Sequence, residues 1–124
     1  FRRVLFRSVV AADRTSAQNR NKVIMKPFLG KPAPFPYGVF LITALMKLPL
    51  YYMFGMRSHL SIFNPKYNVH IEKSNVDFNC PRSEREKQIE NCCGEFVSKL
   101  EKFCMMYPYQ WYNFFNFWNQ VEEK

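Results

Sequence analysis

The segment from Gly38 to Met56 constrains the fold most strongly, because its nineteen residues carry a single charge, Lys47. A run of that length and composition is long enough to cross a membrane as one helix. Pro49 interrupts it just past the middle, and the residues after the proline are aromatic and typical of a strand. We therefore expect a buried helix of about ten residues, a turn at residues 47–49 and a buried strand. A single membrane span is the alternative.

Four short strands are predicted from apolar runs or from apolar–polar alternation. They cover residues 9–12, 22–29, 50–54 and 67–74. Residues 30–36 are predicted to form a loop, because Pro32, Pro34 and Pro36 forbid helix and disfavour pairing inside a sheet. Strand 50–54 is apolar on both faces, which is typical of a sheet covered by helices. The predicted fold class is α/β, a mixed sheet with flanking helices.

The clearest helix begins near Ser83 and ends at Pro108. Ser83 and Glu86 have the spacing of a capping box, in which each side chain bonds a free amide of the first turn. Apolar residues recur at intervals of three and four, so one face of the helix is expected to pack on the sheet. These residues are Ile89, Cys92, Cys93, Phe96, Leu100, Phe103 and Cys104.

The four cysteines lack the two closely spaced pairs that a structural zinc site needs. They are Cys80, Cys92, Cys93 and Cys104. The last three fall on or near the apolar stripe of the long helix, so we interpret them as small buried side chains. No metal or cofactor is expected, and free thiols favour a reducing, cytoplasmic setting.

The first eight residues, FRRVLFRS, match nothing in the pattern that follows, and the chain begins without methionine. We interpret them as a non-native leader that resembles a translated sequencing adapter, so residues 9–124 belong to a single domain. Without the three arginines of the leader, the formal net charge falls from +8 to +5. That charge suits an anionic partner such as a phospholipid surface or a phosphorylated substrate. Nucleic acid is disfavoured, because no RNA-binding motif is present.

Neither histidine has the neighbours that a general base needs. His59 is predicted in a loop, and His70 lies in a strand with Glu72 two residues on, along the same face. A partly exposed histidine beside an exposed carboxylate is favoured over a catalytic pair, because the sequence shows no nucleophile or third group around them.

The most suggestive short motif is Phe35, Pro36, Tyr37 and Gly38. A loop that closes on Pro-x-Gly at the start of an apolar helix leaves backbone amides and the positive end of the helix dipole for an anion. A plain turn at a helix start is the simpler interpretation of the same residues.

The chain ends in a dense aromatic run, with seven aromatic residues among residues 108–118. Tyr and Trp carry a large apolar body with a polar tip, so such a run either closes a core or meets a membrane interface.

Taken in order, four segments are similar to a known family. They read VAADR at 10–14, PFLGKPAPFPYGVF at 27–40, LPLYYMFGMR at 48–57 and YPYQWYNFFNFW at 107–118. They resemble bacterial acyltransferases of the lysophospholipid acyltransferase superfamily, related to the lauroyl acyltransferases of lipid A biosynthesis. The nearest branch resembles predicted acyltransferases found near aryl polyene and flexirubin-type pigment genes. The resemblance implies that residues 9–124 are the C-terminal part of such a domain.

The resemblance implies transfer of a fatty acyl group from acyl carrier protein or a CoA thioester to a hydroxyl of a lipid or glycolipid. The setting it implies is the cytoplasmic face of the bacterial inner membrane. The superfamily uses a His-x4-Asp motif, whose histidine deprotonates the acceptor and whose aspartate orients the ring. Here Asn64 follows His59 and Asn75 follows His70 at that spacing. The catalytic residues are therefore expected upstream of Val9, and this chain alone is expected to be inactive and, through its exposed sheet edge, prone to aggregate.

Substrate contacts carry over residue by residue. Asp13 and Arg14 stand at a strand-end charged motif, where Arg14 could hold a phosphate or carboxylate. The motif at residues 35–38 stands where many relatives have Phe-Pro-Glu-Gly, and Tyr37 replaces the glutamate. The aromatic end is expected to help build the acyl pocket or the membrane face, with core packing as an equal alternative. Its candidates are Trp111, Tyr112, Phe114, Phe115 and Trp118.

A different class of function stays open beside this one. In it the chain is a non-enzymatic membrane-surface module, whose basic charge meets anionic lipid and whose C-terminal aromatics insert at the interface.

Overall fold

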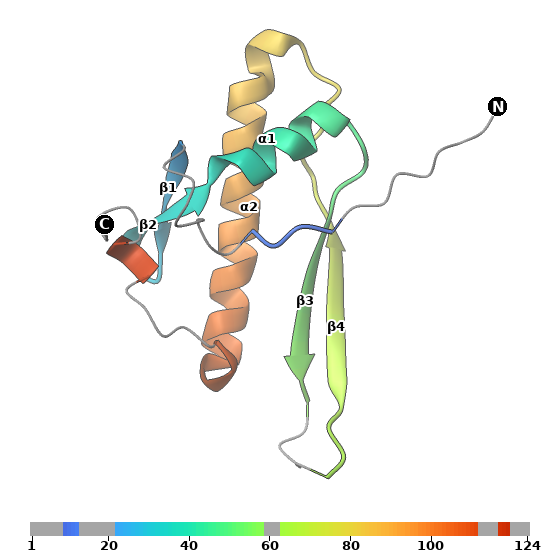
Figure 1. Cartoon of the computed structure of the whole chain (residues 1–124), viewed down its shortest axis with the longest axis vertical. Coiled ribbons are helices and arrows are strands. Elements are labelled where there is room, and N and C mark those ends of the chain that lie inside the picture. Colours follow the sequence, from blue (N-terminus) through green and yellow to red (C-terminus); the bar gives the residue numbers. More distant parts are fainter. Residues whose placement is uncertain (1–8, 13–21, 59–62, 112–116, 120–124) are drawn as a thin grey trace, which may run out of the picture.

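The computed structural model describes residues 9–12, 22–58, 63–111 and 117–119. Within these ranges the chain forms two β-hairpins on either side of a long helix, with a shorter helix across it (Figure 1). The strands are β1 (Val23–Phe28), β2 (Lys31–Pro36), β3 (Tyr51–Arg57) and β4 (Tyr67–Lys73). The helices are α1 (Tyr37–Met46) and α2 (Arg85–Met106), with single 3-10 turns η1 (Arg82–Glu84), η2 (Pro108–Gln110) and η3 (Phe117–Asn119). The prediction of an α/β class is confirmed.

The described strands do not form the predicted mixed sheet. β1 pairs only with β2 and β3 only with β4, each time antiparallel. Strands that follow one another through a short connection pair in this way, and α2 lies between the two hairpins, so their edges do not meet (Figure 1). Residues 9–12, predicted as a strand, have no regular structure.

The predicted loop at residues 30–36 is wrong, because β2 is a strand despite its three prolines. In the register with β1, Pro32, Pro34 and Pro36 occupy alternate positions, and Pro32 lies opposite Pro27. Two facing prolines cannot exchange N–H···O bonds, so these alternate pairs are the non-hydrogen-bonded ones. The missing N–H groups therefore point away from β1, and the ladder loses no bond.

The turn between β1 and β2 consists of two residues with positive φ. Leu29 has φ 51° and Gly30 has φ 84°. Two positive φ angles in a two-residue connection are the mark of a type I′ turn, whose twist matches that of paired strands. This turn fixes the register that brings Phe28 opposite Lys31.

The helix, turn and strand expected between Gly38 and Met56 are confirmed, but the expected burial of the strand on both faces is wrong, because Tyr51 and Met53 on its outer side are more than half exposed. α1 ends at Met46, Lys47 adopts a left-handed conformation with φ 50°, and β3 begins at Tyr51 after Pro49. A single membrane span through this segment is thereby ruled out, and no helix among the described residues is long and apolar enough to span a bilayer.

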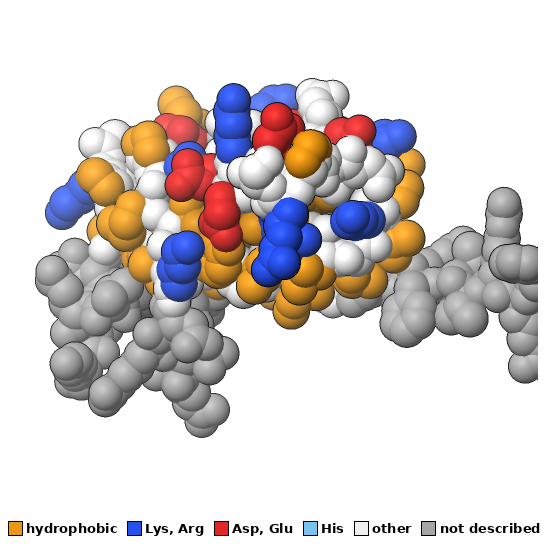
Figure 2. Space-filling model, turned by 90° about the horizontal axis from the view of Figure 1, so that it is seen from above, with side chains coloured by type: hydrophobic (Ala, Val, Ile, Leu, Met, Phe, Trp, Pro, Cys, Tyr) orange, Lys and Arg blue, Asp and Glu red, His pale blue; other side chains and the backbone are white. Residues whose placement is uncertain are grey.

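Helix α1 is apolar on its outer side as well as its inner side. Phe40 and Ala44 are buried, whereas Ile42 and Leu45 are each 54% exposed. In the view of Figure 2, charged side chains are interspersed over the upper part of the picture, and hydrophobic side chains gather along its lower rim. A helix that is apolar all round is more often enclosed than exposed.

Helix α2 carries the core, as its periodicity predicts. Six of the seven predicted positions are buried, and Val97 replaces the half-buried Phe96 in the buried set. The predicted capping box at Ser83 is not formed. Ser83 lies in the 3-10 turn η1, and α2 begins at Arg85 with no side-chain cap, because η1 already supplies the entry to the helix.

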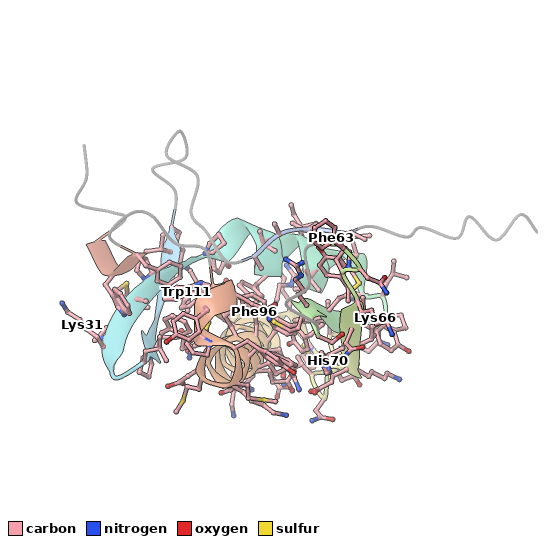
Figure 3. All side chains as sticks on the ribbon, turned by 90° about the horizontal axis from the view of Figure 1, so that it is seen from below. Lys31, Phe63, Lys66, His70, Phe96 and Trp111 are labelled. Carbon is pink, nitrogen blue, oxygen red and sulfur yellow. The ribbon has the colours of Figure 1, made fainter. Side chains whose placement is uncertain are left out.

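The ring of Phe96 links the two hairpins. Its centroid lies 6.3 Å from that of Phe35 in β2 and 5.9 Å from that of Phe54 in β3. It also lies 6.0 Å from that of Phe40 in α1. Figure 3 shows Phe96 at the centre of the molecule, with Trp111 on the side of the first hairpin and His70 on the side of the second. The side chains that β2, β3 and α1 contribute to the core therefore all contact one side chain of α2.

Candidate functional site

The predicted turn motif divides into a buried half and a surface half. Phe35 is fully buried, and its ring packs at 5.8 Å from Phe117 and 6.1 Å from Phe28, so it belongs to the core. Pro36 ends β2 and precedes α1 with extended backbone angles. Gly38 is exposed, and a Cβ built there would touch nothing within 4 Å. Only the second half of the motif is open to a ligand.

Tyr37 is held by groups from outside the motif. Its amide N–H donates to the carbonyl oxygen of Lys22 at 3.3 Å, which uses one of the free amides at the start of α1. Its hydroxyl donates to the carboxylate of Glu86, and this bond raises the pKa of Tyr37. The Lys22 ammonium lies 4.4 Å from the centre of the tyrosine ring and 3.7 Å from Glu86. Tyr37 thus ties α1 to the first turn of α2.

The described part of the aromatic end packs on Phe28. The ring centroids of Trp111 and Phe117 lie 5.4 Å and 5.3 Å from that of Phe28, and that of Trp118 lies at 6.3 Å. The indole N–H of Trp118 donates to the carbonyl oxygen of Phe28 at 3.1 Å. Phe117 is buried, and both tryptophans are half-buried. These contacts place Trp111, Phe117 and Trp118 against the first hairpin.

Gln110 completes the end of β3. Its side-chain oxygen accepts the backbone N–H of Arg57 at 2.7 Å, and its side-chain nitrogen donates to the backbone oxygen of Arg57 at 2.8 Å. The side-chain amide thereby supplies the two bonds that a neighbouring strand would supply.

A polar network, which sequence reasoning missed, lies beneath the second hairpin. The Glu95 carboxylate accepts from the Ser74 hydroxyl at 2.6 Å, the Tyr52 hydroxyl at 2.9 Å and the Asn75 N–H at 3.1 Å. The Tyr52 hydroxyl also lies 3.1 Å from the carbonyl oxygen of Cys92, so its one proton is shared between two acceptors. Burial raises the pKa of Tyr52 well above its usual range. The network fixes the end of β4 on α2.

The pair of His70 and Glu72 does not form a catalytic dyad. Both side chains lie on one face of β4, as the alternation predicts, but that face is turned toward α2 and not toward solvent. The Glu72 carboxylate binds the ammonium of Lys99, which lowers the pKa of Glu72. The His70 ring packs against Phe103, with centroids 4.9 Å apart. Two neighbours on one strand face therefore have different partners on α2.

The buried cysteines are not poised as nucleophiles. Burial raises the pKa of Cys92 and Cys104 to about 11 and that of Cys93 to about 12. A thiol attacks as thiolate, so these groups are unreactive near neutral pH. The interpretation of these three cysteines as buried side chains is confirmed. Across the described ranges no three His, Cys, Asp or Glu side chains gather in a way that could hold a metal ion.

A cleft of about 300 Å³ lies between the turn after α1 and the segment after β4. Lys47 and Lys73 contribute cations to its walls, and Asp77 contributes a carboxylate. None of the predicted site residues lines it.

Several predicted residues lie outside the described ranges: Asp13, Arg14, Tyr112, Phe114, Phe115 and His59. The structure brings Phe35 together with Phe117 of the described aromatic end, and leaves Pro36, Tyr37 and Gly38 at the start of α1. The network around Glu95 has no local signature, because the three side chains that form it, those of Tyr52, Ser74 and Glu95, are each more than twenty residues apart in sequence.

Comparison with known proteins gives no matching family model, no matching curated protein and no matching solved structure.

Proposed function

We propose that residues 9–124 are the C-terminal part of an acyltransferase of the lysophospholipid acyltransferase superfamily. The parent protein transfers a fatty acyl group from acyl carrier protein or acyl-CoA to a hydroxyl of a lipid or glycolipid, at the cytoplasmic face of the bacterial inner membrane. The His-x4-Asp motif is absent from this sequence. In this proposal it is contributed by residues on the N-terminal side of Val9, so the chain by itself is inactive.

The observation that carries the proposal is that four segments of this chain resemble segments of the acyltransferase family and occur in the same order. Three of them are in contact within the described part of the chain, which is what segments of one functional unit require. Trp118 of the last segment donates to Phe28 of the second, and Gln110 of the last segment bonds Arg57 of the third.

The proposal is tested first on the parent reading frame. The source DNA is sequenced across the junction before Val9, and the longer protein is expressed. We expect a His-x4-Asp motif upstream and release of thiol from acyl carrier protein or CoA when a lipid acceptor is present. Replacement of the motif histidine by alanine is expected to lower the rate about 10²–10⁴-fold. The 124-residue chain serves as the inactive control. Turnover by this chain above a heat-killed sample would contradict the proposal, as would a complete upstream frame without the motif.

Arg14 offers a second test in the same protein. If its guanidinium holds a phosphate or carboxylate of a substrate, Arg14→Gln raises KM by about tenfold or more, since a charge-assisted pair contributes roughly 1.5–3 kcal/mol. Arg20→Gln, six residues on, removes an equal charge and is expected to leave KM unchanged. Equal effects of the two substitutions would assign the loss to net charge and remove Arg14 from the substrate contacts.

A further inference from the structure

The second hairpin carries its apolar side chains on the wrong face for a surface sheet. In β4, His70 and Glu72 face α2, whereas Tyr67, Val69 and Ile71 point the other way and are 57–65% exposed. Figure 3 shows His70 on the α2 side of this hairpin. Sheets with one solvated face place polar residues there. The pattern of β4 is the reverse.

The exposed side of β3 continues this apolar surface. Tyr52 and Phe54 are buried against α2, and Tyr51 and Met53 on the opposite side are more than half exposed. In the register Met53 lies opposite Ile71. The outer face is defined here by Tyr51, Met53, Tyr67, Val69 and Ile71. Because these side chains neighbour one another on adjacent strands, they form one continuous patch.

The charged side chains that β3, β4 and the described residues of their connection place beside the outer face are positive, whereas Asp77 lines a cleft together with Lys73. The one carboxylate of the two strands, Glu72, points to α2 and binds Lys99. Lys73 lies opposite Tyr51 at one end of the face, and exposed Lys66 precedes Tyr67 at the other. Phe63, which is 98% exposed, lies before Lys66 in the loop that joins β3 to β4 (Figure 3). Apolar and tyrosine side chains between two lysines match the boundary of an anionic bilayer.

We propose that this outer face docks on an anionic membrane surface. The proposal deepens the proposed function, on which it rests for the membrane partner, and assigns that partner to β3 and β4 rather than to the C-terminal aromatics. The described aromatics, Trp111, Phe117 and Trp118, are engaged with Phe28. A second copy of the chain is a poorer occupant, because two such faces would bring the lysines of one copy toward the lysines of the other.

Binding to vesicles tests the proposal with no acyl donor or acceptor present. Vesicles of phosphatidylcholine with about 30% phosphatidylglycerol and vesicles of pure phosphatidylcholine are sedimented with the chain at low and physiological salt. We expect partition onto the anionic vesicles that weakens with salt. Lys66→Gln and Lys73→Gln are each expected to lower the partition coefficient about fivefold. The double variant Val69→Thr/Ile71→Thr keeps β-branched residues in the strand and is expected to lower it about tenfold or more.

Met105→Gln is the matched control, because Met105 is an equally exposed apolar residue of α2 that does not belong to the outer face. Circular dichroism checks that every variant is folded, and the two lysine variants keep the test valid if the double variant is not. Absence of binding to anionic vesicles at low salt, or equal losses in the control and the outer-face variants, would overturn the proposal. So would sedimentation equilibrium showing a dimer that the double variant dissociates. If the parent protein is inactive but the chain still binds vesicles, the result would count against the proposed acyltransferase activity and leave the docking proposal standing.

Discussion

Leu29 adopts a backbone conformation that few side chains tolerate. With φ 51° it is left-handed, and its Cβ costs roughly 1–2 kcal/mol there. Gly30 beside it meets the same demand without a Cβ. The strained conformation is retained because the turn sets the pairing of Phe28 with Lys31. That pairing in turn fixes the position of the buried Phe28 ring.

Replacing Leu29 by asparagine is expected to stabilise the protein by about 0.5–1 kcal/mol, since asparagine tolerates the left-handed region and favours type I′ turns. The measurement is the midpoint of urea unfolding. Leu48→Asn, at a similarly exposed leucine whose own φ is not positive, is the control and should not raise the midpoint. A midpoint below that of the wild type would show that Leu29 contributes more through packing than it costs in backbone strain.

Cys93 makes stability depend on pH in the alkaline range. Its pKa rises from an ordinary value of 9.0 to about 12, mainly through burial. Above pH 9 the unfolded chain releases a proton that the folded chain retains, so unfolding becomes easier as pH rises. The contribution is constant below pH 9 and is lost by about 1.4 kcal/mol per pH unit above it. Cys93→Ala is expected to flatten the alkaline slope of the unfolding free energy by that amount. Identical slopes in urea titrations from neutral pH to about pH 10.5 would refute it.

The elements of this chain differ in how far local sequence determines them. Between Gly38 and Met56, Pro49 marks the break, and helix, turn and strand fall where the residues predict them. β2 could not be predicted, because whether a proline is tolerated in a strand depends on which edge its nitrogen faces, and only the register with β1 decides that. The separation of the two hairpins could not be predicted either, because it results from α2 lying between them and not from the sequence of either hairpin.

Gln110 contributes to an element from outside it, and its removal is expected to loosen the end of β3. Gln110→Ala deletes both bonds to the backbone of Arg57 and should cost about 1–2 kcal/mol. Gln110→Glu retains the acceptor for the Arg57 N–H but sets a carboxylate oxygen against the Arg57 carbonyl oxygen, so it should recover little of the loss. Hydrogen exchange of the Arg57 amide reports the loss locally, since it should accelerate while the Glu72 amide in β4 changes little. Acceleration throughout β3 and β4 would show instead that the whole hairpin depends on this contact.

At the scale of the whole molecule, the two hairpins communicate through side chains of α2. The ring of Phe96 contacts both hairpins and α1. The sequence places Phe96 on the apolar stripe of α2. Its central position, however, depends on the two hairpins packing on either side of α2, which no local pattern encodes. The network of Tyr52, Ser74 and Glu95 escapes sequence reasoning similarly, because a strand, a loop and a helix each supply one member.

Phe96→Ala is therefore expected to cost about 3–5 kcal/mol and to separate the unfolding of the two hairpins. Phe96→Leu, which keeps most of the volume, should cost less than half as much. Fluorescence of Trp111 and Trp118 follows the first hairpin, and far-ultraviolet circular dichroism follows the helices. Coincident transitions by both probes in Phe96→Ala would show that other contacts suffice to couple the hairpins.

The prolines of β2 also determine how the molecule can associate. Since Pro32, Pro34 and Pro36 turn their nitrogens outward, the edge of β2 that pairs with no strand among the described residues offers carbonyl acceptors and no amide donors at those positions. The carbonyl groups of an incoming strand would therefore find no N–H donor at those positions. The first hairpin is thus closed to cross-β growth on its β2 side, and any intermolecular extension of that sheet has to begin at β1.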